Sequence, residues 1–220
     1  MSITSEILKL NSELPTYVKL VAVSKFHPVA AIEEAYTAGQ RIFGESRVQE
    51  LCEKQPLLPQ DIEWHFIGHL QTNKIKQIVP FVSLIHGVDS LRLLKEINKE
   101  GEKAGRVVPC LLQIFVAQEE TKFGLSPEEC LSLISEGVLK TLPFVEIRGL
   151  MGMASLTNNQ AQIRAEFGQL KVLFDELKIL LNMSAFKELS MGMSDDYPLA
   201  VECGSTMVRI GSRIFGHREY

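Results

Sequence analysis

Short apolar runs alternate with helical patterns along the whole chain. The runs have the length and β-branched content typical of strands buried on both faces of a parallel sheet. A helical pattern follows nearly every run, which is the order expected of an α/β fold. The expected strands cover residues 18–23, 41–44, 63–67, 82–86, 107–116, 145–150, 188–191 and 206–210. The expected helices cover residues 2–14, 29–39, 45–54, 71–79, 90–104, 160–181 and 195–203, with another beginning at Ser126.

This pattern predicts a single closed (β/α)8 barrel, a TIM barrel, with an extra helix at the N-terminus. The chain has 220 residues, and such barrels use about 200–250. We find no linker, low-complexity segment or shift in composition, so residues 1–220 are expected to form one domain. The alternative is an open doubly wound sheet. However, the Gly-x-Gly-x-x-Gly pattern of nucleotide-binding sheets is missing after the first expected strand.

Composition narrows the class of partner. The formal net charge of −4 gives no electrostatic reason to expect nucleic-acid binding. The four cysteines are scattered without a Cys-x-x-Cys pair, so neither a zinc site nor a redox pair is indicated. The chain begins without a secretory signal pattern, and no apolar run approaches the roughly 20 residues that span a bilayer. We therefore expect a cytoplasmic protein that binds neither membranes nor nucleic acids.

The first expected strand ends at Ser24 and Lys25. Ligand sites in barrels lie at the carboxyl ends of the strands, so Lys25 is expected to face the mouth of the barrel. A lysine there is either a salt-bridge partner or a reactive amine. The second role requires a desolvated setting that lowers the lysine pKa from about 10.4 toward neutrality, so that the amine can attack a carbonyl.

A second group of polar residues surrounds the last expected strand. Loops after the final strands of barrels often bind phosphate through backbone N–H groups, a glycine and small hydroxyls. Gly211 would let the backbone approach an anion, and Arg209 would present a fixed planar cation to the barrel mouth. The candidate hydroxyls belong to Ser205, Thr206 and Ser212. An ordinary turn with a surface arginine is the alternative interpretation.

Two further clusters contain polar residues. The loop 190–196, which begins at Ser190, joins small residues to a helix start and is a second candidate anion site. A simple cap of that helix is the alternative. His65 and His69 are four residues apart, but Gly68 and the strand-like residues between them argue against the helical metal-binding motif. We therefore expect no metal site.

The lysine and the phosphate loop form a coherent pair. In a closed barrel the first and last strands are neighbours, so Lys25 and Arg209 would lie side by side. Together they suit a phosphorylated aldehyde, with the aldehyde on the amine and the phosphate at the last loop. That description fits pyridoxal 5′-phosphate (PLP). The residues expected to bind it are Lys25, Ser190, Ser205, Thr206, Arg209, Gly211 and Ser212.

Seven short motifs are distributed along the chain between residues 23 and 211. They are Val-Ser-Lys at 23–25, Phe-Gly-Glu at 43–45, His-Phe-Ile-Gly-His-Leu-Gln-Thr-Asn-Lys at 65–74, Thr-Lys-Phe-Gly at 121–124, Gly-Leu-Met at 149–151, Ser-Met-Gly-Met-Ser-Asp-Asp at 190–196 and Gly-Ser-Thr-Met-Val-Arg-Ile-Gly at 204–211. In this order they resemble the pyridoxal phosphate homeostasis protein family. The resemblance implies a fold-type III PLP-binding barrel like the N-terminal domain of alanine racemase.

The resemblance also implies roles for individual residues. PLP would be held as an internal aldimine on Lys25, and Arg209 would face the pyridine nitrogen. Because arginine stays protonated, it would keep that nitrogen unprotonated and make the cofactor a poor electron sink. The chain departs from the family pattern at Ser46 and Phe115, where asparagine is common. Any cofactor contact made by those two side chains would therefore differ.

The function implied by the resemblance is maintenance of intracellular PLP. The protein would buffer the cofactor and deliver it to apo forms of PLP-dependent enzymes, without being an enzyme itself. The alternative is an amino-acid racemase, which needs acid–base groups on both faces of the cofactor. Lys25 could serve one face. In alanine racemase a tyrosine from the second domain of the partner serves the other face.

This chain ends at Tyr220, a few residues after the last expected strand, so that second domain is expected to be missing. Tyr197 and Tyr220 remain available as bases, although nothing in the sequence around either marks it as one. A barrel of this size can bury enough core to stand alone, and we therefore expect a monomer.

Overall fold

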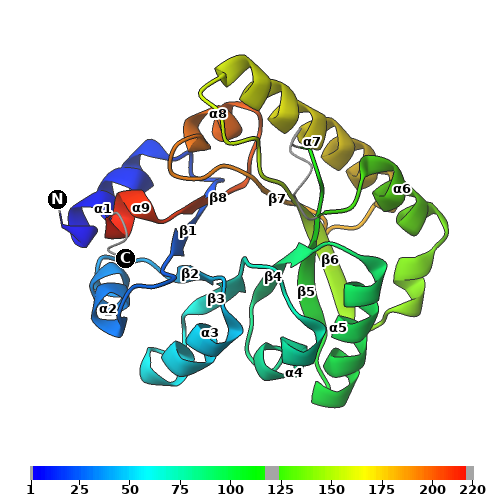
Figure 1. Cartoon of the computed structure of the whole chain (residues 1–220), viewed down its shortest axis with the longest axis horizontal. Helices are drawn as coiled ribbons and strands as arrows, with labels where there is room; N and C mark the ends of the chain where they lie inside the picture. The colour runs from blue at the N-terminus through cyan, green and yellow to red at the C-terminus, as the bar shows by residue number, and fades with distance from the viewer. Residues whose placement is uncertain (1, 117–123, 217–220) are drawn as a thin grey trace.

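The computed structural model describes residues 2–116 and 124–216 and confirms the predicted barrel. Eight parallel strands close in chain order, with β1 paired to β8 (Figure 1). The strands are β1 (Lys19–Val23), β2 (Ile42–Glu45), β3 (Glu63–Phe66), β4 (Leu84–Val88), β5 (Val108–Gln113), β6 (Val145–Met151), β7 (Glu188–Ser190) and β8 (Met207–Ile210). The helices are α1 (Ile3–Glu13), α2 (Val29–Thr37), α3 (Val48–Lys54), α4 (Ile75–Ile78), α5 (Leu91–Ala104), α6 (Pro127–Ser135), α7 (Gln160–Leu181), α8 (Tyr197–Glu202) and α9 (Ser212–Phe215).

The helices surround the barrel, and most lie where the sequence predicts them (Figure 1). The expected extra helix is α1, which packs beside α2 and α9. The helix expected over 71–79 is instead a 3-10 turn, Thr72–Lys74, followed by the four-residue α4. Helix α9 was not predicted, because four residues are too few to show a helical period.

Several helix ends have the caps that their sequences predict. The Ser90 hydroxyl accepts from Leu93 N–H at 3.3 Å before α5. Ser126 and Glu129 form a reciprocal capping box before α6. These local bonds satisfy backbone donors that have no partner within the helix, and they fix where each helix begins.

The residues of each strand point alternately into the barrel and toward the helices. In β1, Leu20 and Ala22 join the large core between strands and helices. A smaller apolar cluster contains Val21, Leu84, Leu111, Met151 and Met207, all from strands. In β8, Val208 and Ile210 belong to the outer core, so Arg209 between them points inward. The inside of the barrel therefore combines an apolar layer with a buried cation.

The cysteines are free thiols: Cys52, Cys110, Cys130 and Cys203. Burial raises the pKa of Cys130 to about 12 and raises the pKa of Cys110 as well. Because the thiolate is the reactive form, both groups are inert near neutral pH. In the described ranges no helix is both long enough and apolar enough to cross a membrane.

Candidate functional site

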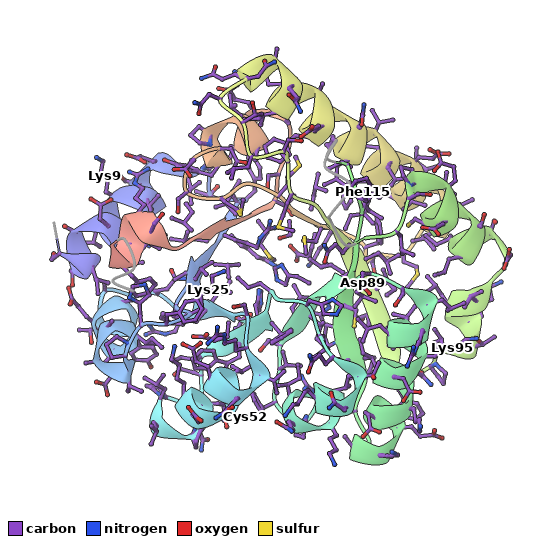
Figure 2. All side chains as sticks on the ribbon, in the orientation of Figure 1. Lys9, Lys25, Cys52, Asp89, Lys95 and Phe115 are labelled. Atoms are coloured by element: carbon purple, nitrogen blue, oxygen red, sulfur yellow. The ribbon has the colours of Figure 1, made fainter. Side chains whose placement is uncertain are left out.

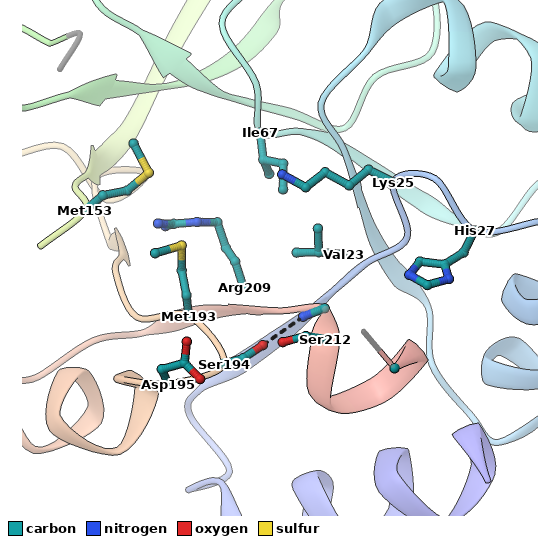
Figure 3. Close-up of a pocket in the computed structure, with 12 residues that line it drawn as sticks. Val23, Lys25, His27, Ile67, Met153, Met193, Ser194, Asp195, Arg209 and Ser212 are labelled. Carbon is teal, nitrogen blue, oxygen red and sulfur yellow. Dashed lines mark hydrogen bonds between the residues drawn. The ribbon is translucent and has the colours of Figure 1, made fainter. Parts of the chain in front are cut away.

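A cavity of about 250 Å³ lies at the carboxyl end of the barrel. Its walls come from the ends of β1 and β8 and from the segments after β3, β6 and β7 (Figure 3). The lining residues are Val23, Lys25, His27, Ile67, Met153, Met193, Ser194, Asp195, Arg209, Gly211, Ser212 and Gly216. Ligand pockets usually have volumes of about 300–1,000 Å³, so this one suits a small ligand.

Lys25 lies just after β1 and lines this cavity. Figure 2 shows it inside the ring of helices, whereas Lys9 and Lys95 lie on the outer helices. Its side chain extends toward Ile67 across the space that Arg209 borders from the other side (Figure 3). The structure therefore places the predicted amine where a ligand in the barrel mouth would meet it.

Arg209 is buried, and its guanidinium is held by three hydrogen bonds. Nη1 donates to the backbone oxygen of Ser190 at 2.9 Å and to its hydroxyl at 2.6 Å. Nη2 donates to Gly152 O at 3.1 Å. Burial lowers the Arg209 pKa to about 10, so the group stays charged at neutral pH. Among the described residues, two of the five N–H donors of this guanidinium make no hydrogen bond.

The barrel closure brings Lys25 and Arg209 to one site, as the sequence analysis expected. Val21 pairs with Arg209 and Ala22 with Ile210 in the register of β1 and β8. The two cationic side chains lie far apart in sequence, yet both line the cavity. The combination offers a fixed charge and an amine to the same ligand.

Small polar groups border the cavity at the end of β8. The Gly211 N–H donates to the Ser194 hydroxyl at 3.3 Å, and Ser212 begins α9 beside this pair (Figure 3). A Cβ added to Gly211 would lie 3.1 Å from Val23 O, so glycine lets this turn pack closely against β1. Backbone N–H groups and hydroxyls in this arrangement suit an anion.

Ser205 and Thr206 lie elsewhere, which corrects the extent of the expected phosphate loop. Strand β8 begins at Met207, so both residues precede it and lie at its amino end, opposite the cavity. The Ser205 hydroxyl contacts the Leu189 and Met191 backbone oxygens at 3.1 and 2.8 Å. The Thr206 hydroxyl accepts from Leu189 N–H at 2.7 Å. Both groups bond to the β7 region and do not line the cavity.

A buried polar chain runs from Arg209 into the barrel. Because Arg209 can only donate, the Ser190 hydroxyl accepts from it, and the same hydroxyl is hydrogen-bonded to His86 Nδ1 at 3.1 Å. His86 Nε2 is in turn hydrogen-bonded to His65 Nδ1 at 3.0 Å. The sequence suggested Ser190 as a ligand of the cofactor. In the structure it does not line the cavity and instead accepts hydrogen bonds from the Arg209 guanidinium. Sequence reasoning missed His86, since a lone histidine in an apolar strand resembles a core residue.

The two buried histidines predict a specific acid sensitivity. Burial lowers the pKa of His65 to about 3 and that of His86 well below its usual value. Both bind protons more readily in the unfolded chain, where the pKa is about 6.5. The stability that depends on neutral His65 is complete above pH 6.5 and is lost as pH falls toward 3, and the loss from His86 has the same sign. We expect His65 to lower the free energy of unfolding by about 1.4 kcal/mol per pH unit in that range.

Urea unfolding between pH 7 and pH 4 tests this expectation. His65→Asn keeps an amide that can donate to or accept from His86 but takes up no proton, so the variant should show a flatter pH dependence. His69→Asn is the control, because the His69 side chain is 50% exposed and its ring bonds Asp89 instead. Equal slopes for wild type and His65→Asn would contradict the assignment of the buried pair.

His65 and His69 do not form a site together, and the described residues contain no group of three or more metal-ligating side chains. Ser46 and Phe115, the two departures from the family pattern, do not line the cavity. Phe115 N–H donates to Leu125 O at 2.9 Å, next to β5. The part of the 121–124 motif at 121–123 and Tyr220 lie outside the described residues.

Comparisons with known proteins agree with this architecture. The model of the alanine racemase N-terminal domain family matches residues 2–219. The pyridoxal phosphate homeostasis protein of Haemophilus influenzae is 41% identical over 206 residues, which cover 92% of this chain and 86% of that protein. The protein of the same name from Synechocystis sp. is 41% identical over 220 residues, covering 99% of this chain and 98% of that protein.

Solved structures of related proteins have the same barrel fold. PipY of Synechococcus elongatus with PLP bound has a TM-score of 0.89 and 41% identity, covering 98% of this chain and 100% of that chain. Alanine racemase from Clostridium difficile has a TM-score of 0.79 at 16% identity, covering 100% of this chain and 56% of that chain. The second likeness shows the fold alone. The chain therefore belongs to the pyridoxal phosphate homeostasis protein family, built on the alanine racemase N-terminal domain.

Proposed function

We propose that this protein binds PLP in the cavity at the carboxyl end of the barrel and maintains its level by buffering and delivering it. One observation carries the proposal: Lys25, Arg209 and the Ser194–Gly211–Ser212 group line the same small cavity. An amine, a fixed cation and an anion-binding turn are the groups that a phosphorylated pyridine aldehyde requires. The relatives at 41% identity bear the corresponding name, and PipY has been solved with PLP bound.

The residues present fit each part of the ligand. Lys25 would form the covalent link to the aldehyde carbon, with the carbonyl oxygen leaving as water. The Gly211 turn, with Ser194 and Ser212, would bind the phosphate. Arg209 would donate to the ring nitrogen through the N–H groups that make no bond among the described residues. Bound PLP supplies an electrophilic carbon and an electron-withdrawing ring.

The setting of Arg209 determines how it would act on the ring nitrogen of bound PLP. Its pKa of about 10 keeps the guanidinium protonated at neutral pH. A permanent donor beside the ring nitrogen leaves no acceptor for a proton on that nitrogen, so the ring withdraws electrons weakly. That arrangement disfavours reactions that store negative charge in the ring.

The alternative function, an amino-acid racemase, needs a second base at the cavity. Tyr197 was one candidate, but it does not line the cavity. Its hydroxyl donates to Glu13 Oε2 at 2.9 Å and accepts from Arg213. These contacts join α8 to α1 and α9, which is a structural role. The position of Tyr197 therefore does not support its use as that second base.

In the cell, the apo forms of PLP-dependent enzymes would receive the cofactor from this protein. A free aldehyde reacts with many amines, and direct transfer from protein to enzyme limits such reactions. The protein would act in the cytoplasm as a monomer.

Two measurements on the loaded protein test the proposed function. The protein is first saturated with PLP and then mixed with an apo PLP-dependent enzyme, whose recovered activity is followed. A carrier should restore that activity. The second measurement follows α-proton exchange of alanine in D₂O, and a carrier should show none above the rate with free PLP. Failure to bind PLP would overturn the whole proposal, and catalytic α-proton exchange would favour the racemase.

A further inference from the structure

Lys25 occupies the second position of a tight turn. The His27 N–H donates to Ser24 O at 3.1 Å and closes the turn over four residues. The third residue, Phe26, has a φ of 68°, in the left-handed region where turns normally place glycine. A residue with a large side chain keeps this conformation only where its surroundings hold it. The turn that carries the amine is therefore strained and requires support.

Helix α3 supplies that support at three points. Glu50 Oε1 accepts from the Phe26 N–H at 2.5 Å. Lys54 Nζ donates to Ser24 O at 2.9 Å. The Arg47 guanidinium, from the residue that caps α3, lies 4.5 Å from the centre of the Phe26 ring. These contacts hold Ser24 and Phe26, the residues on either side of Lys25, while the Lys25 side chain lines the cavity.

All three protons of the Lys54 ammonium are used in hydrogen bonds around the turn 24–27. Lys54 is only 6% exposed, and its three protons go to Ser24 O, to Glu45 Oε1 at 2.8 Å and to Glu50 Oε1 at 2.7 Å. The Ser24 hydroxyl also donates to Glu45 Oε1, at 2.7 Å. Buried ion pairs add little net stability over apolar packing, and their better-attested role is to specify one geometry.

We propose that Glu50 and Lys54 are positioning residues that hold the turn 24–27 and so aim the Lys25 amine into the cavity before a ligand arrives. The inference rests on the proposed function, because that function assigns the covalent link to Lys25. A preset amine loses less conformational freedom when it meets the aldehyde, which raises the rate of attachment. Lys54 itself is not a second reactive amine, since each of its protons already has an acceptor.

Variants of Glu50 test the inference on the folded protein. Glu50→Ala removes the acceptor of the Phe26 N–H, whereas Glu50→Gln keeps an amide oxygen there. Glu53→Ala is the matched control, on the same helix but exposed and bonded to Gln49 instead. Two quantities are measured: amide hydrogen exchange at Phe26 without PLP, and the rate at which added PLP becomes trapped by borohydride.

We expect Glu50→Ala to lose protection at Phe26 and to slow attachment about tenfold, which corresponds to one charge-assisted hydrogen bond. Glu50→Gln should retain most of both, and Glu53→Ala should match wild type. Arg47→Ala, at an exposed position that does not threaten the fold, should slow attachment about threefold.

The outcomes distinguish failure of PLP binding from failure of the positioning role of α3. If wild type never traps PLP, the proposed function fails, although the apo exchange of Phe26 would still report whether α3 holds the turn. If wild type traps PLP but Glu50→Ala and Arg47→Ala attach it at the wild-type rate, the positioning role is wrong. Equal loss in Glu50→Ala and Glu53→Ala would also overturn it, since that result would reflect general weakening of α3.

Discussion

Replacing Lys25 with alanine is expected to abolish the covalent attachment of PLP. In wild type, added PLP should give a visible absorption band that borohydride removes, because reduction fixes the carbon–nitrogen link. Lys25 is the lysine that lines the cavity among the described residues, so none of their other amines is placed to replace it. We expect the band to disappear in Lys25→Ala, while weak, reversible binding through the anion-binding turn remains.

The matched control is Lys76→Ala. Lys76 is exposed on α4, so its loss should leave the band and its borohydride sensitivity at wild-type levels. Circular dichroism checks that both variants are folded. An undiminished band in folded Lys25→Ala would show that another amine holds the cofactor, and the assignment of the site would then be wrong.

The second large effect is expected from Gly149→Ala, which should cost about 3–5 kcal/mol of the free energy of unfolding. Gly149 lies in β6 at a shift in register, where Cys110 pairs with Ile147 but Leu111 pairs with Gly149. A Cβ added at Gly149 would lie 1.7 Å from Glu188 O in β7, and the backbone φ is 152°. Since the obstacle is a backbone oxygen, β6 and β7 would have to separate.

Gly168→Ala is the control for this substitution. Gly168 lies within α7, and a Cβ there would meet nothing within 4 Å. Alanine favours the helix, so stability should rise by up to about 1 kcal/mol. Urea unfolding of the three proteins measures both effects. If Gly149→Ala lost less than about 1 kcal/mol, β6 and β7 would not approach each other as closely as described.

The alternation of strands and helices was enough to predict the barrel, because each apolar run must be covered by a neighbouring helix. The closure of β1 on β8 followed from that prediction, and it accounts for the meeting of Lys25 and Arg209. Helix α9 could not be predicted from the helical spacing of apolar residues, since it has only four residues. Yet its first residue, Ser212, is among those that line the cavity.

The residues that line the cavity were harder to predict, because the exact point where each strand ends decides which side chains reach it. Ser205 and Thr206 share a motif with Gly211, but β8 separates the two ends of that motif and only the carboxyl end meets the cavity. Ser194 belongs to the loop 190–196, for which the sequence left an anion site and a helix cap as alternatives, and it lines the cavity. His86 meets Ser190 across the barrel interior, and only the folded chain brings these residues together.

One measurement tests the central claim most directly. The protein is incubated with PLP, reduced with borohydride, digested and mapped by mass spectrometry. The account predicts one labelled peptide at stoichiometric yield, with the pyridoxyl group on Lys25. Label spread over exposed lysines such as Lys76, or no label at all, would contradict the claim that this barrel holds the cofactor through Lys25.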